Sequence, residues 1–118
     1  RDLGLSDEIA EQIYKVLLGD GFVDETRFAQ AFAGGKFRIN HWGRVRIRLE
    51  LQRRDIAPGV IKVAIESINE VEYRQILRDL LTKKRQQYRS STDFQQRNKT
   101  ATALIRAGFE PELVFEYL

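Results

Sequence analysis

Apolar residues recur along this chain at the three- and four-residue spacing of amphipathic helices. The pattern predicts helices over about residues 6–18, 24–37, 43–54, 59–67, 69–89, 93–106 and 111–118. No stretch alternates with a period of two for long enough to predict a strand. We therefore expect an all-α protein with seven helices.

Residues with known preferences for helix ends support these limits. Asp24 is a suitable N-terminal cap, and Asn69 followed by Glu72 resembles a capping box. Gly34 and Gly35 are expected to weaken or bend the second helix, which should break at about residues 38–41. Six aromatic residues fall at core spacing and are predicted to be buried: Phe22, Phe28, Phe32, Tyr73, Phe109 and Phe115.

The order of the helices repeats along the chain. An acidic helix start followed by two apolar positions recurs at an offset of 45 residues, and the third helix of each group matches at about 53. Such self-similarity is typical of arrays of stacked repeats. We predict a leading helix or the end of a preceding repeat at residues 1–18, a central three-helix repeat at 19–67 and a C-terminal three-helix repeat at 68–118.

Charge is distributed unevenly along the chain, although the net charge is only +3. Residues 1–34 carry −4, residues 35–62 carry +6 and residues 63–118 carry +1. Such separation can steer an encounter with a polyanion or with a partner of mixed charge. We predict a partner-binding surface made of basic residues from the middle third, joined by Trp42 and two acidic residues: Lys36, Arg38, Trp42, Arg44, Arg46, Arg48, Arg53, Arg54, Asp24 and Glu25.

The helix over residues 43–54 carries five arginines among apolar residues. Ile47 and Leu51 fall on one side and Val45 and Leu49 on nearly the opposite side, which predicts a helix buried on two sides with arginines emerging along two seams. The alternative is a solvated face in which Glu50 pairs with arginines of its own helix.

Two members of the predicted surface have further interpretations. Trp42 could stack on a base, anchor a protein contact or fill the junction between repeats. Asp24 and Glu25 could cap a helix or meet basic residues of a partner.

The composition argues against an enzyme. The chain has no cysteine and a single histidine, His41, for which we expect a loop position. It offers no phosphate-binding glycine loop, no nucleophile elbow and no metal-ligand spacing, so no cofactor is expected. No apolar run reaches the roughly 18 residues that span a bilayer. We expect a soluble, cytoplasmic monomer and, because Arg1 rather than Met begins the sequence, a longer natural chain.

Two motifs resemble those of a known family. The first motif covers residues 22–29 and reads Phe-Val-Asp-Glu-Thr-Arg-Phe-Ala. Residues 43–51 contain a glycine, an Arg-Ile pair and a Glu-Leu pair, with two residues between one and the next. Both resemble motifs of the RecX family of bacterial recombination regulators. The matching positions are Phe22, Asp24, Glu25, Phe28, Ala29, Gly43, Arg46, Ile47, Glu50 and Leu51.

The resemblance implies a curved stack of three-helix repeats that binds the RecA recombinase filament on single-stranded DNA and inhibits its ATPase, strand-exchange and co-protease activities. It implies no cofactor. The family usually has a helix-ending glycine where this chain has Asp55, which tolerates the left-handed conformation, and it usually carries an additional leading repeat. The alternatives from other functional classes are a stand-alone helical DNA-binding module and a structural adaptor.

Overall fold

The computed structural model describes residues 25–118 of the chain, and these residues form helices and short connections without any strand. The helices are α2 (Glu25–Asn40), α3 (Arg44–Arg53), α4 (Pro58–Glu66), α5 (Glu70–Gln87), α6 (Asp93–Arg106) and α7 (Pro111–Tyr117). The all-α prediction is confirmed for this part of the chain. The helix predicted over residues 6–18 and the predicted cap Asp24 lie outside the described residues.

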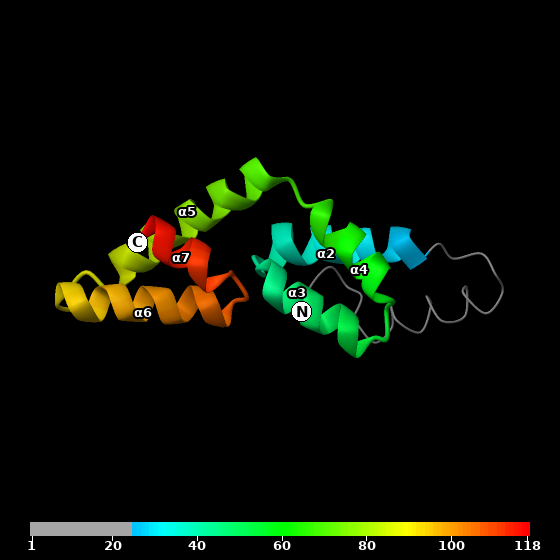
Figure 1. The fold of residues 1–118 in the computed structure, drawn as a ribbon. Helices are drawn as coiled ribbons and strands as arrows, with labels where there is room; N and C mark the ends of the chain where they lie inside the picture. Colours follow the sequence, from blue (N-terminus) through cyan, green and yellow to red (C-terminus); the bar gives the residue numbers. More distant parts are fainter. Residues whose placement is uncertain (1–24) are drawn as a thin grey trace.

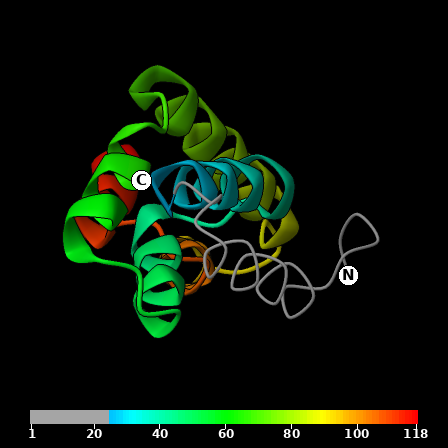
Figure 2. The same cartoon turned by 90° about the vertical axis from the view of Figure 1, so that its right-hand side faces the viewer.

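The helices form two three-helix units, α2–α4 and α5–α7, that follow one another along the long axis (Figure 1). The structure measures 57 × 27 × 21 Å along its principal axes. In the view along the long axis, α3 lies in front of α6 and α4 in front of α7 (Figure 2). The predicted elongated array of tandem three-helix repeats is therefore confirmed.

Local chemistry defines the N-terminal ends of α5, α6 and α7. Asn69 Oδ1 accepts a hydrogen bond from Glu72 N–H at 2.8 Å, and Thr92 Oγ1 accepts one from Gln95 N–H at 3.2 Å. These side chains satisfy N–H groups that have no partner within their own helix. Pro111 occupies the first turn of α7, where a missing N–H costs nothing.

Within residues 25–118, three connections use a left-handed backbone. Gly108 has φ 106°, Asp55 has φ 58° and His41 has φ 57°. The expectation that Asp55 adopts this conformation in place of glycine is confirmed, and His41 occupies the predicted loop position. Helix α2 continues through Gly34 and Gly35 and ends at Asn40.

The core is continuous within the described residues and contains apolar side chains from every helix. Ile47 and Leu51 of α3 are fully buried, but Leu49 is 49% exposed and Val45 is only partly covered. The prediction of two buried sides on α3 is therefore wrong. Helix α3 packs against α2 and α4 mainly through one side, and its second apolar row borders solvent. Phe115 was also predicted to be buried, but it lies on the short helix α7 and is 47% exposed.

The two units meet where the C-terminus of α6 abuts the N-terminus of α3 (Figure 1). Gly43 N–H donates to Ala107 O and Val45 N–H donates to Gly108 O, both at 2.9 Å. Gly43 has no side chain with which to cap α3, so the neighbouring unit supplies the acceptors. A Cβ at Gly43 would lie 2.2 Å from the carbonyl carbon of Gly108, which is closer than any real contact.

Replacement of Gly43 by alanine should therefore destabilise the protein. We expect the free energy of unfolding of Gly43→Ala to fall by about 2 kcal/mol or more, because the new methyl group meets main-chain atoms that cannot rotate away. Gly35→Ala is the matched control, since a Cβ there meets nothing within 4 Å and alanine favours a helix by about 0.5–1 kcal/mol. Urea unfolding followed by circular dichroism measures both, and equal stabilities would contradict the role of Gly43.

Candidate functional site

Arg44 is the first of the predicted surface residues whose position differs from expectation. Its Nη1 lies 3.0 Å from Glu70 Oε1, and its Nε lies 2.9 Å from Glu110 Oε2. The guanidinium carbon is 3.9 Å from the centroid of the Tyr73 ring, and the side chain is only 17% exposed. Arg44 therefore holds the two units together instead of facing outward along a seam.

Tyr73 lies at the centre of the same junction. Its hydroxyl donates to Glu110 Oε1 at 2.6 Å and accepts from Arg44 N–H at 2.9 Å. Its ring packs between Phe37 and Phe109, with centroid distances of 5.4 and 5.3 Å. Burial, followed by the hydrogen bond to Glu110, raises the pKa of the Tyr73 hydroxyl well above its usual range, so the group stays protonated as a donor.

Arg38 contributes a second ion pair across the junction. Its Nε lies 3.1 Å from Glu72 Oε2 in an arrangement that includes a second hydrogen bond from Nη2. This bidentate geometry is the stronger form of an arginine–carboxylate contact, although both side chains are exposed to solvent.

Glu50 engages the last two arginines of the predicted surface. Its carboxylate lies 2.6 Å from Arg53 Nη1 and 3.0 Å from Arg54 Nη1. Arg54 is only 12% exposed and stacks over the Phe32 ring, whereas Arg53 is 73% exposed. The alternative of pairing within the helix is therefore found for Arg53 and Arg54, although Arg53 still presents its side chain to solvent.

Arg46 and Arg48 are the exposed arginines of α3 that form no ion pair with a described residue. The guanidinium carbon of Arg46 lies 4.0 Å from the Trp42 ring, a stacking geometry that holds its planar group in place. Lys36 approaches the Trp42 ring at 4.9 Å and is itself buried. Trp42 thus packs between cations and Phe32, which makes its ring a support for Arg46.

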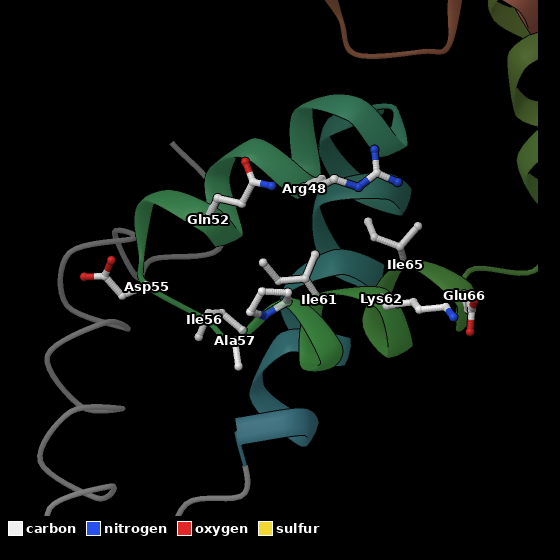
Figure 3. A pocket seen from close by; sticks show the side chains of 10 residues that line it. Arg48, Gln52, Asp55, Ile56, Ala57, Ile61, Lys62, Ile65 and Glu66 are labelled. Carbon is white, nitrogen blue, oxygen red and sulfur yellow. The ribbon is translucent and has the colours of Figure 1, made fainter.

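Arg48 borders a groove between α3 and α4 with a volume of about 640 Å³ (Figure 3). The buried side chains of Ile61 and Ile65 from α4 form part of its apolar floor. Lys62 and Glu66 line the α4 side, so the groove combines an apolar floor with a charged edge.

The structure therefore sorts the predicted surface into groups. The outward arginines of α3, named the α3 strip, are Arg46, Arg48 and Arg53. Arg46 and Arg53 line a hollow beside α6, whereas Arg48 lies on the opposite flank, beside α4. Arg44, Arg54 and Lys36 are directed into the molecule, and Arg38 lies at the junction between units. Glu25 begins α2 and is half-buried, and Asp24 lies outside the described residues.

Sequence reasoning missed a second basic region. Residues 80–109 contain seven basic residues and one acidic residue. A charge count over residues 63–118 conceals this excess because glutamates near both ends of that segment compensate it. None of the seven forms an ion pair with a described residue: Lys83, Lys84, Arg85, Arg89, Arg97, Lys99 and Arg106.

Neither a metal-binding cluster nor a membrane-spanning helix occurs within residues 25–118. No three His, Asp or Glu side chains in this range are arranged to hold a metal ion. None of the helices in this range is both long enough and apolar enough to cross a bilayer.

Comparison with known protein families gives two matches that together cover most of the chain. The second three-helix domain of RecX matches residues 24–65. The third three-helix domain of RecX matches residues 70–118. Each match coincides with one of the two three-helix units.

Individual relatives agree with this result. The chain is 30% identical over 112 residues to the regulatory protein RecX of Stenotrophomonas maltophilia, covering 94% of this chain and 66% of that protein. It is 25% identical over 114 residues to the regulatory protein RecX of Geobacillus kaustophilus, covering 97% of this chain and 42% of that protein. The chain thus spans between about two-fifths and two-thirds of the length of these relatives.

Solved structures share the fold. The crystal structure of a regulatory protein RecX aligns with a TM-score of 0.75 at 20% identity, covering 97% of this chain and 56% of that one. The crystal structure of RecX from Lactobacillus salivarius aligns with a TM-score of 0.76 at 16% identity, covering 99% of this chain and 76% of that one.

The ion pairs of the junction should make the stability of the protein depend on pH. Hydrogen bonds from Arg74 and then Arg44 lower the pKa of Glu70, and one from Arg38 lowers the pKa of Glu72. A carboxylate with a lowered folded-state pKa contributes stability above its unfolded-state pKa, and this contribution is lost as the pH falls through the folded-state value. We expect the thermal unfolding midpoint to decrease between about pH 7 and about pH 3.

The double variant Glu70→Gln/Glu72→Gln should have a lower midpoint than the parent at neutral pH but a smaller decrease in acid. Glu112→Gln is the control, because Glu112 is exposed and forms no ion pair with a described residue. Circular dichroism melting curves provide the measurement, and an unchanged pH dependence in the double variant would disprove this origin.

Proposed function

Since the chain belongs to the RecX family, we propose that it binds the RecA recombinase filament on single-stranded DNA. In this proposal it inhibits the filament's ATPase, strand-exchange and co-protease activities and thereby modulates recombination and the SOS response. The name of its relatives, regulatory protein RecX, supports a regulatory role. The proposal treats the chain as a cytoplasmic monomer that acts by binding, without catalysis and without a cofactor.

The observation that carries the proposal is the α3 strip. Arg46 and Arg48 present guanidinium groups without an ion pair to a described residue, and Arg53 remains largely exposed beside Glu50. Planar guanidinium groups bind carboxylates and phosphates through paired hydrogen bonds. Such a strip suits the surface of a nucleoprotein filament, which offers phosphates and acidic side chains together.

The same proposal includes the other predicted partner contacts. We propose that Asp24 and Glu25, in the acidic first third of the chain, face basic groups of a neighbouring filament subunit. Arg38 and Arg44 position the strip through the junction. The division into units at residues 19–67 and 68–118 also stays a prediction.

A second candidate is the stand-alone helical DNA-binding module. Its support is the charge of residues 25–118, which carry eighteen basic and eleven acidic side chains and so have a net charge of +7. Such a module would bind DNA tightly in the absence of RecA, with a steep dependence on salt concentration. A titration against DNA alone, RecA alone and the RecA–DNA filament separates the candidates, because only the proposed function predicts that RecA raises the affinity above that for DNA alone.

Charge reversal on the α3 strip tests the proposed function. We expect Arg46→Glu/Arg48→Glu to raise the concentration for half-inhibition of RecA-dependent ATP hydrolysis by about tenfold or more, equivalent to about 1.4 kcal/mol of binding. The reason is that two outward cations would become anions facing phosphates or carboxylates.

The control is Arg78→Glu/Lys83→Glu, which changes the net charge equally on exposed positions of α5. We expect its inhibition to stay within about twofold of the parent, because surface charges beyond a Debye length of about 10 Å are largely screened. Helical circular dichroism establishes that both variants fold. Equal inhibition by the strip variant and the parent would refute the assignment.

A further inference from the structure

Two surface hollows on helix α6 share one residue. The first has a volume of about 260 Å³ and includes Tyr88, Lys99 and Arg106 in its wall. The second has a volume of about 250 Å³ and includes Arg46, Arg53 and Arg106. Arg106 therefore joins a hollow of the C-terminal unit to a hollow at the junction with α3.

The cations along these hollows follow a regular spacing. Lys99 and Arg106 are seven residues apart on α6, and Arg46 and Arg53 are seven residues apart on α3. Seven residues make nearly two helical turns, so each pair lies on one face about 10 Å apart. Helices α6 and α3 follow one another along the molecule (Figure 1), and Arg106 lines the same hollow as Arg46 and Arg53, so the two pairs adjoin through Arg106.

The row has little internal neutralisation. The first hollow has no carboxylate in its wall, as far as residues 25–118 are concerned. The second hollow contains Glu50, whose carboxylate is held by Arg53 and Arg54. Lys99 and Arg106 form no ion pair with a described residue. Unpaired like charges repel one another, and a polyanion relieves that repulsion.

The first hollow also offers groups that suit a base. Tyr88 contributes a half-buried ring, and Lys99 Nζ lies 5.7 Å from the centroid of that ring. Asn98 and Thr102 line the same hollow with an amide and a hydroxyl that can donate and accept hydrogen bonds. An aromatic ring among cations is the combination with which proteins stack bases while binding the phosphate backbone.

We propose that Tyr88, Lys99, Arg106, Arg46 and Arg53, here named the α6–α3 track, form a binding path for single-stranded DNA. The α6 pair and the α3 pair each cover about 10 Å of helix, so the helical parts of the track add up to about 20 Å. Only an unpaired base can reach the Tyr88 ring, because the bases of a duplex are stacked on one another. The inference deepens the proposed function and rests on it for the presence of single-stranded DNA.

Direct binding to DNA tests the track. The probe is a fluorescently labelled oligothymidine titrated with the full chain in the absence of RecA and followed by anisotropy at several salt concentrations. We expect Lys99→Glu/Arg106→Glu to weaken binding by about tenfold or more and to reduce the salt slope by about 1.4, the value for two lost phosphate contacts on a single strand. The control Lys83→Glu/Arg89→Glu carries the same charge change at exposed positions outside both hollows.

A second variant separates stacking from charge. Tyr88→Leu should weaken binding about fivefold or more while the salt slope stays unchanged, because loss of stacking releases no counterions. Tyr88→Phe should retain the affinity, since it keeps the ring. Circular dichroism checks that each variant is folded.

Several outcomes would overturn the inference. One is that the control loses as much DNA affinity as Lys99→Glu/Arg106→Glu. Another is that Lys99→Glu/Arg106→Glu binds DNA as tightly as the parent. A third is that polyglutamate competes for the chain as well as oligothymidine does. Inhibition of RecA-dependent ATP hydrolysis is read separately. A chain that inhibits RecA but binds oligothymidine independently of Lys99 and Arg106 disproves the track alone. A chain that needs them for DNA binding but never affects RecA disproves the proposed function, and the track stands as a DNA site.

Discussion

The arrangement of the two units depends on how the N-terminus of α3 satisfies its main-chain donors. A helix leaves its first N–H groups without internal partners, and a buried donor without a partner is costly. Helix α6 solves this with its own Thr92, but α3 begins at a glycine that has no side chain. Its donors instead reach Ala107 O, Gly108 O and the Tyr73 hydroxyl, all in the other unit. The helix is therefore complete only when the units are docked.

The same junction determines which charges remain on the surface. The C-terminal unit places Glu70, Glu72 and Glu110 against the α3 end of its neighbour, where they engage Arg38 and Arg44. Those cations are used to hold the units together. The basic residues at the far end of α5 and along α6 form no ion pair with a described residue. Residues 25–118 carry a net charge of +7, and three of their acids are engaged at the junction.

Sequence periodicity predicted what depends on local chemistry. The helices and the cap at Asn69 follow from preferences of the residues themselves. The left-handed Asp55 was expected only from the resemblance, because the family usually has glycine there. Periodicity failed where distant segments meet. Arg44 is separated by 26 residues from Glu70, which it contacts, and no helical pattern reveals that pairing. Likewise, Leu49 looked like a core residue because periodicity shows that a helix has an apolar side but not whether another helix covers it.

The charge pattern needed the structure for a related reason. Counting charge by segment averages residues that lie at opposite ends of a unit, so the acids of the junction concealed the cations of α6. Folding separates these groups and joins others from distant parts of the chain. Arg106 directly precedes the two carbonyl groups that hold α3, so the main-chain contacts of the junction also bring Arg106 beside Arg46 and Arg53. Because one short segment both docks the units and carries the shared cation, a change in docking must also change the alignment of the basic row.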